Sequence, residues 1–442
     1  PCTYRTHLLT ELTEEDMMKR HKRTRTPARL LGLSAAVLTA AAAAFTYTAA
    51  TGTAIPNEAT EPSAAPSSGA TRTVRYDLGN KAWHLPQTGE PGELAGVVHY
   101  PADLGTGRHP LIVMLHGLHD TCADRKAEAA RTAAEKSGDD AAYEAANAKL
   151  AAWPCAPGTP ALPSQRGYDY LGRKLAARGF VVVSVGANGI NASSVMGDDN
   201  AAARADLINR HLRMWQQLSA KGQGELAWKF TDPATGAARR VGFAHHVDMG
   251  NVGIMGHSRA GAGVTWQAAD SHRKQWPKGV DVKAVAALAP AYNVMTEDMA
   301  NYRITKTPFA AFRGTCDGQV GGEALPFAAD AATGNRSGFH RFAIRGANHN
   351  FFNTQWSPQS RQVAAFDDAT PVKGHPGKCT DREDGPPARQ LTEPQQRHVA
   401  TTYLDAFFRR YLLGDTGQNL ILTGARHPDA AITDVDVTSA AP

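Results

Sequence analysis

The stretch GIMGHSRAGAG, residues 253–263, places a serine between small residues at the end of a short apolar run. The run that begins at Asn251 predicts a buried strand, and the residues after Ser258 suit a helix. A strand that turns sharply into a helix at a serine exposes the hydroxyl at the strand's carboxyl end, the geometry of a nucleophile elbow. Gly256 supplies one small residue for this turn, but Ala260 replaces the second glycine of the G-x-S-x-G pattern. A glycine-rich turn without chemistry is therefore the alternative.

The rest of the chain repeats this strand-then-helix pattern. Apolar runs rich in Val, Ile and Leu begin near residues 96, 110, 179, 251, 282, 307 and 338. Helical spacing of apolar residues predicts core helices over 201–219 and from residue 393 onward. Continuous apolar strands that alternate with helices are buried on both sides, so the fold class is α/β, with a mostly parallel central sheet and helices on both faces.

The amino-terminal residues, 1–54, differ in composition from the rest. From Met18 a basic stretch is followed by an alanine-rich apolar stretch, which predicts a secretory signal peptide that is cleaved after Ala50 or Ala54. A membrane anchor is the alternative, but the apolar stretch is short, so no stable anchor is expected. Residues 55–72 are rich in Pro, Ser, Ala and Thr and predict a flexible linker. The mature protein is expected to be secreted.

The formal charge of +5 comes mostly from this leader. Residues 1–54 carry seven Lys or Arg and four Asp or Glu, so the remainder has a charge of about +2. Nucleic-acid binding needs a surface rich in Lys and Arg, and none is expected here. The composition, 42% hydrophobic and 20% charged, is typical of a globular protein. We expect one domain over 73–413, a carboxy-terminal tail over 414–442, and a monomer.

An insertion over 123–154 is charged and alanine-rich and contains few large apolar side chains. The break at KSGDD predicts two polar helices in a hairpin, and a disordered insertion is the alternative.

The cysteines that remain after the leader are Cys122, Cys155, Cys316 and Cys379. In an exported chain they favour two disulfides. Among the three pairings, we predict Cys122 with Cys155 and Cys316 with Cys379, because neither closed segment then crosses the other. Free buried thiols are the alternative. No Cys and His pair has the spacing of zinc ligands, so neither a metal nor another cofactor is expected.

Two further loops carry the partners that a nucleophilic serine needs. An activated serine requires a histidine base, and the histidine requires an acid that fixes its tautomer. Asp317 lies in RGTCDGQV and His349 in RGANHNFF, each directly after an apolar run. Both are therefore expected in loops at strand carboxyl ends, in the chain order Ser, Asp, His. A turn aspartate and a structural histidine are the alternatives.

Attack on a carbonyl builds an oxyanion, which needs fixed N–H donors. We predict the N–H groups of Arg259 and Leu118 as these donors. His116 and Gly117, which precede Leu118 in LIVMLHGL, are expected to shape the loop and contact substrate. Asn188, after the run near 179, and Phe351, after His349, are further candidates for the lining of the substrate site. Turn formation and core packing are the alternatives for those two residues.

Five motifs together resemble the secreted bacterial α/β-hydrolases of the serine esterase and lipase kind. They are LIVMLHG, GYDYLGRKLAARGFVVVSVGANGIN, VGIMGHSRAG, GTCDGQV and GANHNFFN, and the resemblance covers about residues 74–412. Polyester-hydrolase-like and platelet-activating-factor-acetylhydrolase-like members belong to this kind. The resemblance implies a Ser258, Asp317 and His349 triad and hydrolysis of a small-molecule, lipid or polymer ester without a cofactor. Ala260 and the insertion after the oxyanion loop depart from the pattern.

Three functions follow from this sequence. The first is a secreted carboxylic ester hydrolase with an acyl-enzyme intermediate. The second is an amide hydrolase or acyltransferase with the same triad, since pocket water and leaving-group contacts decide the outcome. The third is a non-catalytic exported binding protein on a hydrolase scaffold, because fold alone does not fix function.

Overall fold

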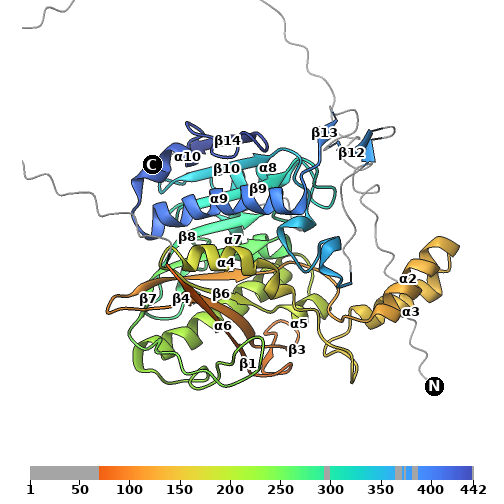
Figure 1. The fold of residues 1–442 in the computed structure, drawn as a ribbon, viewed down its shortest axis with the longest axis horizontal. Coiled ribbons are helices and arrows are strands. Elements are labelled where there is room, and N and C mark those ends of the chain that lie inside the picture. The colour runs from red at the N-terminus through yellow and green to blue at the C-terminus, as the bar shows by residue number, and fades with distance from the viewer. Residues whose placement is uncertain (1–68, 293–298, 364–370, 373–374, 381–386, 441–442) are drawn as a thin grey trace, which may run out of the picture. The chain divides into compact units, whose positions relative to one another are not determined.

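The computed structural model describes residues 69–292, 299–363, 371–372, 375–380 and 387–440. The signal peptide predicted over 1–54 lies outside these residues, as does all of the predicted linker except residues 69–72. Figure 1 shows the arrangement of the elements.

The strands fall into one large sheet and two small ones. The large sheet comprises β1 (Thr71–Asp77), β4 (Ala95–Pro101), β5 (His109–Leu115), β6 (Val181–Val185), β7 (Val247–His257), β8 (Val282–Leu288), β9 (Phe309–Gly314), β10 (Phe339–Ile344) and β14 (Val435–Ala440). The small sheets pair β2 (Trp83–His84) with β3 (Pro91–Gly92), and β12 (His375–Cys379) with β11 (Pro371–Val372) and β13 (Ala388–Arg389). All seven apolar runs predicted from the sequence form strands, β4 to β10.

The large sheet has the order β1-β4-β6-β5-β7-β8-β9-β10-β14. Within the run β6-β5-β7-β8-β9-β10, every pair of adjacent strands is parallel. The pairs β1 with β4, β4 with β6, and β10 with β14 are antiparallel and lie toward the two edges. The predicted α/β class with a mostly parallel sheet is confirmed. Because the inner strands are parallel, their carboxyl ends meet at one edge of the sheet, where loops from different strands come together.

The helices cover both faces of this sheet. The α-helices in the described ranges are α2 (Arg125–Ser137), α3 (Asp140–Leu150), α4 (Asp169–Ala176), α5 (Asn188–Ala192), α6 (Gly197–Lys221), α7 (Arg259–Ala268), α8 (Ala324–Ala331), α9 (Glu393–Leu412) and α10 (Asn419–Leu422). Of these, α2 and α3 extend away from the sheet. Alternate residues of β5 show the two layers: Leu111 and Val113 belong to the core under α6 and α7, whereas Ile112 and Met114 pack in the core with α4 and α9. Both layers are buried, which is why the strands are apolar without alternation.

The two long helices begin and end as their sequences dictate. Helix α6 has Asp198 and Asp199 in its first turn, where they favour the positive end of the helix dipole, and ends at Gly222 in a left-handed conformation. Helix α9 begins at a capping box in which Thr392 and Gln395 bond each other's backbone N–H groups. Both core helices predicted from the sequence are confirmed. Helix α6 extends beyond the predicted range 201–219 at both ends.

The insertion over 123–154 forms the predicted hairpin. Asp124 caps α2 by accepting from two backbone N–H groups, Gly138 ends it with φ 68°, and Asp139 caps α3. The Cys122–Cys155 disulfide joins the base of the hairpin, with the Cα atoms 5.6 Å apart. Figure 1 shows the pair of helices extending from the end of the domain that carries α5.

The two ends of the domain differ from the predicted boundaries. Strand β1 begins at Thr71, inside the stretch predicted as linker. Residues 414–442, predicted as a tail without a period, contain α10 and the edge strand β14. Strand β14 alternates buried or half-buried with exposed residues along VDVTSA because only one of its faces packs on the domain, and this short alternation lacks the long apolar run that marks the inner strands.

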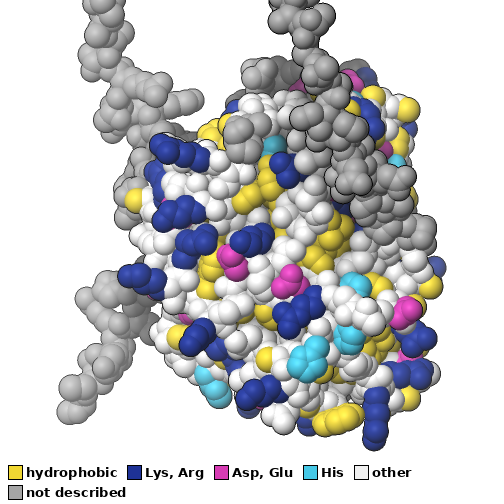
Figure 2. Space-filling model, turned by 90° about the vertical axis from the view of Figure 1, so that its left-hand side faces the viewer, with side chains coloured by type: hydrophobic (Ala, Val, Ile, Leu, Met, Phe, Trp, Pro, Cys, Tyr) yellow, Lys and Arg dark blue, Asp and Glu magenta, His cyan; other side chains and the backbone are white. Residues whose placement is uncertain are grey.

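Charged side chains of both signs lie on the face of the fold that Figure 2 shows, and Lys and Arg predominate there. Figure 2 shows Lys and Arg spread over one face, with Asp, Glu and His among them and hydrophobic side chains between. In the described ranges, no helix has the length and apolar character that crossing a membrane requires.

Candidate active site

Ser258 lies between the end of β7 and the start of α7, at the carboxyl edge of the sheet. Its backbone has φ 60° and ψ −129°, a conformation that a residue with a side chain seldom adopts. The Ser258 N–H donates to the carbonyl of Leu288 at 2.9 Å, and the Ser258 carbonyl accepts from Gly261 at 2.7 Å. These bonds hold the strained turn in place, as functional sites commonly require. The strand-turn-helix geometry predicted from the sequence is present.

Close backbone approaches explain the small residues around this turn. A Cβ at Gly256 would overlap the carbonyl oxygen of Ala260, and a Cβ at Gly261 would lie 2.7 Å from the side chain of Pro290. Ala260 itself is fully buried in the core. The close approach of α7 to the segment after β8 therefore occurs at Gly261, one residue after the usual second glycine. This shift accounts for the alanine that departs from the G-x-S-x-G pattern.

Asp317 and His349 come together from the loops that follow β9 and β10. His349 Nδ1 lies 2.8 Å from Asp317 Oδ2, and both side chains are buried. The other carboxylate oxygen, Oδ1, accepts from the N–H groups of Gln319 at 3.1 Å and Val320 at 2.8 Å. A carboxylate held by two backbone donors fixes the ring of its histidine partner, which places the Nδ1 hydrogen toward the acid.

Covalent and hydrogen-bonded contacts anchor these two loops. Cys316 precedes Asp317 and forms a disulfide with Cys379, with the Cα atoms 5.5 Å apart. Gln396 on α9 accepts from the Asn348 N–H at 2.9 Å and donates to the Asn348 carbonyl at 2.8 Å. Both predicted disulfide pairings are confirmed. The residues beside Asp317 and His349 are therefore tied to separate parts of the fold.

The elbow and the His349 loop lie against each other through aromatic rings. His257, which precedes Ser258, has its ring centroid 4.9 Å from that of His349 and 5.1 Å from that of Trp356. Its Nδ1 is 2.9 Å from the hydroxyl of Tyr168. Burial holds the pKa of His257 well below its usual range, so this ring is neutral. The packing brings His349 next to the turn that carries Ser258.

The two residues predicted as oxyanion donors belong to the start of α7 and to the loop after β5. Arg259 is the first residue of α7, where an N–H has no acceptor within the helix. The loop after β5 passes close to Ser258: a Cβ at Gly117 would lie 2.6 Å from the His257 carbonyl oxygen and would overlap Ser258 Cβ. Leu118 follows, and within the described ranges its N–H donates to no backbone acceptor. Gly117 is therefore required for the loop to reach the serine.

Arg204 on α6, which the sequence analysis did not identify, holds this loop from below. Its guanidinium is fully buried and donates to the His116 carbonyl at 3.1 Å, to Asn191 Oδ1 at 2.7 Å and to Asn200 Oδ1 at 2.9 Å. Asn191 in turn donates to the Gly117 carbonyl at 3.0 Å. Burial lowers the pKa of Arg204 to about 9, so the group remains charged at neutral pH.

His116 lies beneath the loop, with no exposed surface. Its Nε2 accepts from the Ala187 N–H at 2.8 Å, so the ring hydrogen is on Nδ1, which donates to the Gly117 carbonyl at 3.0 Å. Burial lowers the pKa of His116 to about 3, and the ring is neutral. His116 therefore supports the loop, and its buried ring leaves no exposed surface for the predicted contact with substrate.

Asn188 and Phe351 are also buried. Asn188 begins α5 and donates to the Leu162 carbonyl at 2.9 Å, and Phe351 belongs to the 3₁₀ turn Asn350–Phe352 after His349. Glu93, a further residue missed from the sequence, accepts from the N–H groups of Asn188 at 2.5 Å and Gly189 at 2.8 Å. Burial raises the pKa of Glu93. In the sequence, the only sign of Glu93 and Arg204 is a charged residue among mostly apolar neighbours. Their partners become visible only when the segments pack together.

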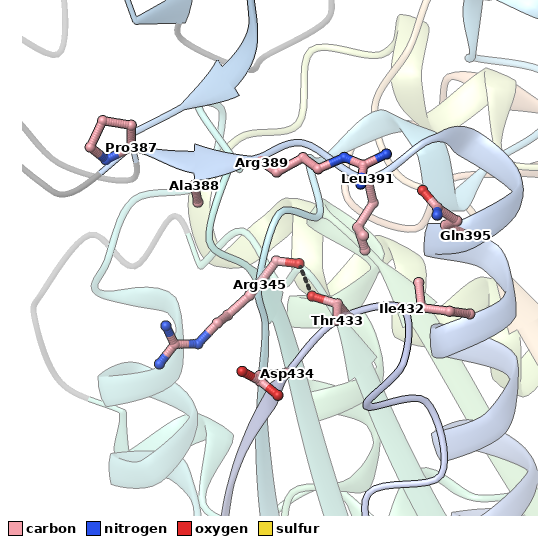
Figure 3. Close-up of a pocket in the computed structure, with 9 residues that line it drawn as sticks. All are labelled: Arg345, Pro387, Ala388, Arg389, Leu391, Gln395, Ile432, Thr433 and Asp434. Carbon is pink, nitrogen blue, oxygen red and sulfur yellow. Dashed lines mark hydrogen bonds between the residues drawn. The ribbon is translucent and has the colours of Figure 1, made fainter. Parts of the chain in front are cut away.

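A cavity of about 280 Å³ lies among the segments that follow β10, precede α9 and precede β14 (Figure 3). Its lining includes Arg345 at the end of β10, Leu391, and Gln395 on α9. The Thr433 hydroxyl donates to the Arg345 carbonyl at 2.7 Å. None of the predicted site residues lines this cavity. Within the described ranges, no group of three or more His, Cys, Asp or Glu side chains is placed to hold a metal.

A scan against protein-family models and a search of curated proteins both find no match to this chain. The structure brings a serine at a strained turn near a histidine that is held by a buried carboxylate. These are the groups from which a nucleophile and its base can be built.

Proposed function

We propose that the protein is a serine hydrolase of the α/β-hydrolase fold that cleaves carboxylic esters. The observation that carries the proposal is Ser258 at φ 60° between β7 and α7, beside a histidine that is bonded to Asp317 at 2.8 Å. All three residues follow the carboxyl ends of parallel strands in the main sheet, in the order Ser, Asp, His along the chain. The α/β fold with nine strands in the main sheet is compatible with this class.

The proposed reaction has two acyl-transfer steps. His349 takes the Ser258 proton through Nε2 as the hydroxyl oxygen attacks the ester carbonyl carbon, and Asp317 stabilises the resulting imidazolium. The N–H groups of Arg259 and Leu118 donate to the oxyanion. His349 returns the proton to the alkoxide as the C–O bond breaks, and the alcohol leaves. Water, deprotonated by His349, then attacks the acyl-enzyme and releases the acid, and the proton returns to Ser258.

Export is part of the same proposal. Two disulfides are typical of proteins that fold in oxidising compartments, and this supports an extracellular site of action. The basic and apolar leader within residues 1–54 supplies the signal.

Replacement of Ser258 tests the activity. We expect Ser258→Ala to lose essentially all turnover of 4-nitrophenyl acetate and butyrate, by about 10⁴-fold or more, because the nucleophile is gone. Ser219→Ala is the matched control, since Ser219 is also buried and donates to the Val247 carbonyl at the opposite end of β7. It should retain activity. Equal rates for Ser258→Ala and the parent protein at equal melting temperature would contradict the proposal.

A further inference from the structure

The α2–α3 hairpin is an insertion that the proposed reaction does not use directly. Its first helix begins at Arg125, shortly after residues 116–122, the Leu118 loop. The N–H of Leu118 is one of the two proposed donors to the oxyanion. Figure 1 shows both helices of the hairpin extending away from the sheet. The hairpin nevertheless contacts the Leu118 loop, through a side chain and through the backbone.

Arg131 on α2 joins the hairpin to the Leu118 loop. Its guanidinium donates to both carboxylate oxygens of Asp120, at 2.9 Å and 2.7 Å. It also donates to Asn147 Oδ1 on α3 at 3.2 Å. Only 12% of the Arg131 side chain and 13% of the Asp120 side chain are exposed, so water weakens this ion pair less than an exposed one. A bidentate pair of this kind fixes orientation as well as distance.

The backbone that follows Asp120 is held at the base of the hairpin. The N–H groups of Thr121 and Cys122 donate to the Leu150 carbonyl, at 2.8 Å and 3.0 Å. The Thr121 hydroxyl donates to the same carbonyl at 2.9 Å. The end of the Leu118 loop is therefore bound to the last residue of α3 by its backbone and to α2 by Arg131.

A ring contact joins the same loop to the segment that follows His349. The ring of His119, the residue after Leu118, is stacked on Trp356, with the ring centres 5.2 Å apart and an angle of 16° between the planes. The ring centre of Trp356 is 5.1 Å from that of His257, the residue before the proposed nucleophile. Holding the end of the loop therefore also holds its place against the turn.

The beginning of the Leu118 loop has a separate anchor. Arg204 on α6 donates to the His116 carbonyl at 3.1 Å, and the loop then passes close to Ser258 at Gly117. The Leu118 N–H therefore lies between one anchor on α6 and another on the hairpin. Movement of either anchor changes the position of this N–H relative to the serine.

We propose that the α2–α3 hairpin positions the Leu118 N–H for the oxyanion, and that it acts through the Arg131 and Asp120 pair. Arg131 is a positioning residue, because it acts through the carboxylate that lies two residues after the donor. This inference rests on the proposed ester hydrolysis. Loss of the guanidinium leaves a largely buried carboxylate without its partner, so the end of the loop must rearrange. Displacements of about 1 Å at a catalytic group can cost on the order of 10² in rate.

Arg131→Gln tests the inference with 4-nitrophenyl butyrate as the substrate. We expect kcat to fall by about tenfold and KM to change by less than about threefold, because the loss concerns a donor to the transition state. Asp120→Asn should cause a loss of similar size. The double variant should lose no more than either single variant, because the two side chains act as one unit. Losses that multiply in the double variant would contradict this role for the pair.

Arg210→Gln is the matched control for the loss of a bidentate arginine. Arg210 on α6 donates to both carboxylate oxygens of Glu225, at 2.8 Å and 2.6 Å, and belongs neither to the hairpin nor to the Leu118 loop. This variant should keep the kcat of the parent protein. An equal kcat in the parent protein and in Arg131→Gln would overturn the inference.

Hydrogen exchange separates this inference from the proposed activity. In Arg131→Gln the backbone N–H groups of residues 116–122 should exchange about fivefold faster than in the parent protein, whereas Arg210→Gln should leave their exchange unchanged. Peptide mass spectrometry after exchange into D₂O measures these rates. If no ester is cleaved but the exchange result holds, the proposed activity fails and the anchoring of the loop by the hairpin stands. Equal exchange in the parent protein and in Arg131→Gln would overturn the inference whatever the activity.

Discussion

The turn at Ser258 and the pair formed by Asp317 and His349 are built in different ways. The turn is local: one strand, one helix and close approaches at Gly256 and Gly261 fix its shape. The pair is assembled from two loops whose residues are 32 positions apart, by hydrogen bonds and a disulfide. Steric fit therefore dominates the first region, and tertiary contacts dominate the second.

This difference predicts two kinds of response to mutation. An added atom in the turn has no room to be accommodated, because the obstacles are the carbonyl of Ala260 and the rigid ring and Cα of Pro290. A lost contact in the loop pair leaves the remaining contacts in place, so its effect should be graded. The following predictions test whether the two regions behave in this way.

The largest effect is expected at Gly117, where the loop after β5 passes against the turn at Ser258. In Gly117→Ala the new Cβ would meet the His257 carbonyl oxygen at 2.6 Å, so the loop must move and carry the Leu118 N–H away from the oxyanion. We expect kcat/KM for 4-nitrophenyl butyrate to fall by about 10² to 10³, the usual effect of losing one oxyanion donor. Gly107→Ala is the control, because a Cβ at Gly107 would meet nothing within 4 Å. A loss of similar size in both variants would refute the steric explanation.

The two disulfides should differ in their effect on turnover. Serine replacement of both Cys316 and Cys379 frees the residue next to Asp317, and we expect kcat to fall by about tenfold to hundredfold, as small displacements of catalytic groups do. The same change at Cys122 and Cys155 releases the base of the α2–α3 hairpin and should lower kcat less. Both double variants should lose about 2 to 4 kcal/mol of unfolding free energy. A larger drop in kcat for the hairpin disulfide would reverse the comparison.

The smallest effect concerns the stability of the fold in acid, which depends on histidines that are buried in the neutral form. Burial lowers the pKa of His116 and of His211 to about 3, and the Nδ1 atom of His211 lies 2.7 Å from the hydroxyl of Tyr76. In the unfolded chain these rings bind protons near pH 6.5. The unfolded state therefore gains protons first as the pH falls from about 6.5 toward 3, and folding stability is lost over that window.

At pH 5 each such histidine should lower the unfolding free energy by about 2 kcal/mol relative to pH 7. His211→Asn removes one of them, so its stability should fall less between pH 7 and pH 5 than that of the parent protein, although it is less stable at both. Urea denaturation at the two pH values measures this difference. Equal losses in the two proteins would show that His211 is not held neutral.

The sequence was sufficient for the parts of the molecule that depend on local pattern. The inner strands, α6, α9, the hairpin and the turn at Ser258 follow from apolar runs, caps and small residues. The loop positions of Asp317 and His349 follow from the rule that such residues come after parallel strands. Their separation of 2.8 Å required the structure.

The supports of the site were not predictable, because they depend on contacts between distant segments. Arg204 reads as one more charge on an amphipathic helix until α6 is placed against the His116 loop. Gln396 reads as a helix surface residue until α9 packs on the Asn348 loop. Strand β14 is apolar on one face only, and its pairing with β10 depends on an edge that the sequence does not mark.

Labelling with a fluorophosphonate followed by peptide mass mapping tests the central claim most directly, because the reagent reacts with activated serines. We predict a single label on the peptide that contains Ser258, and its loss in His349→Gln, where the base is removed. A folded protein that remains unlabelled, or one labelled at another serine with Ser258 untouched, would contradict the account.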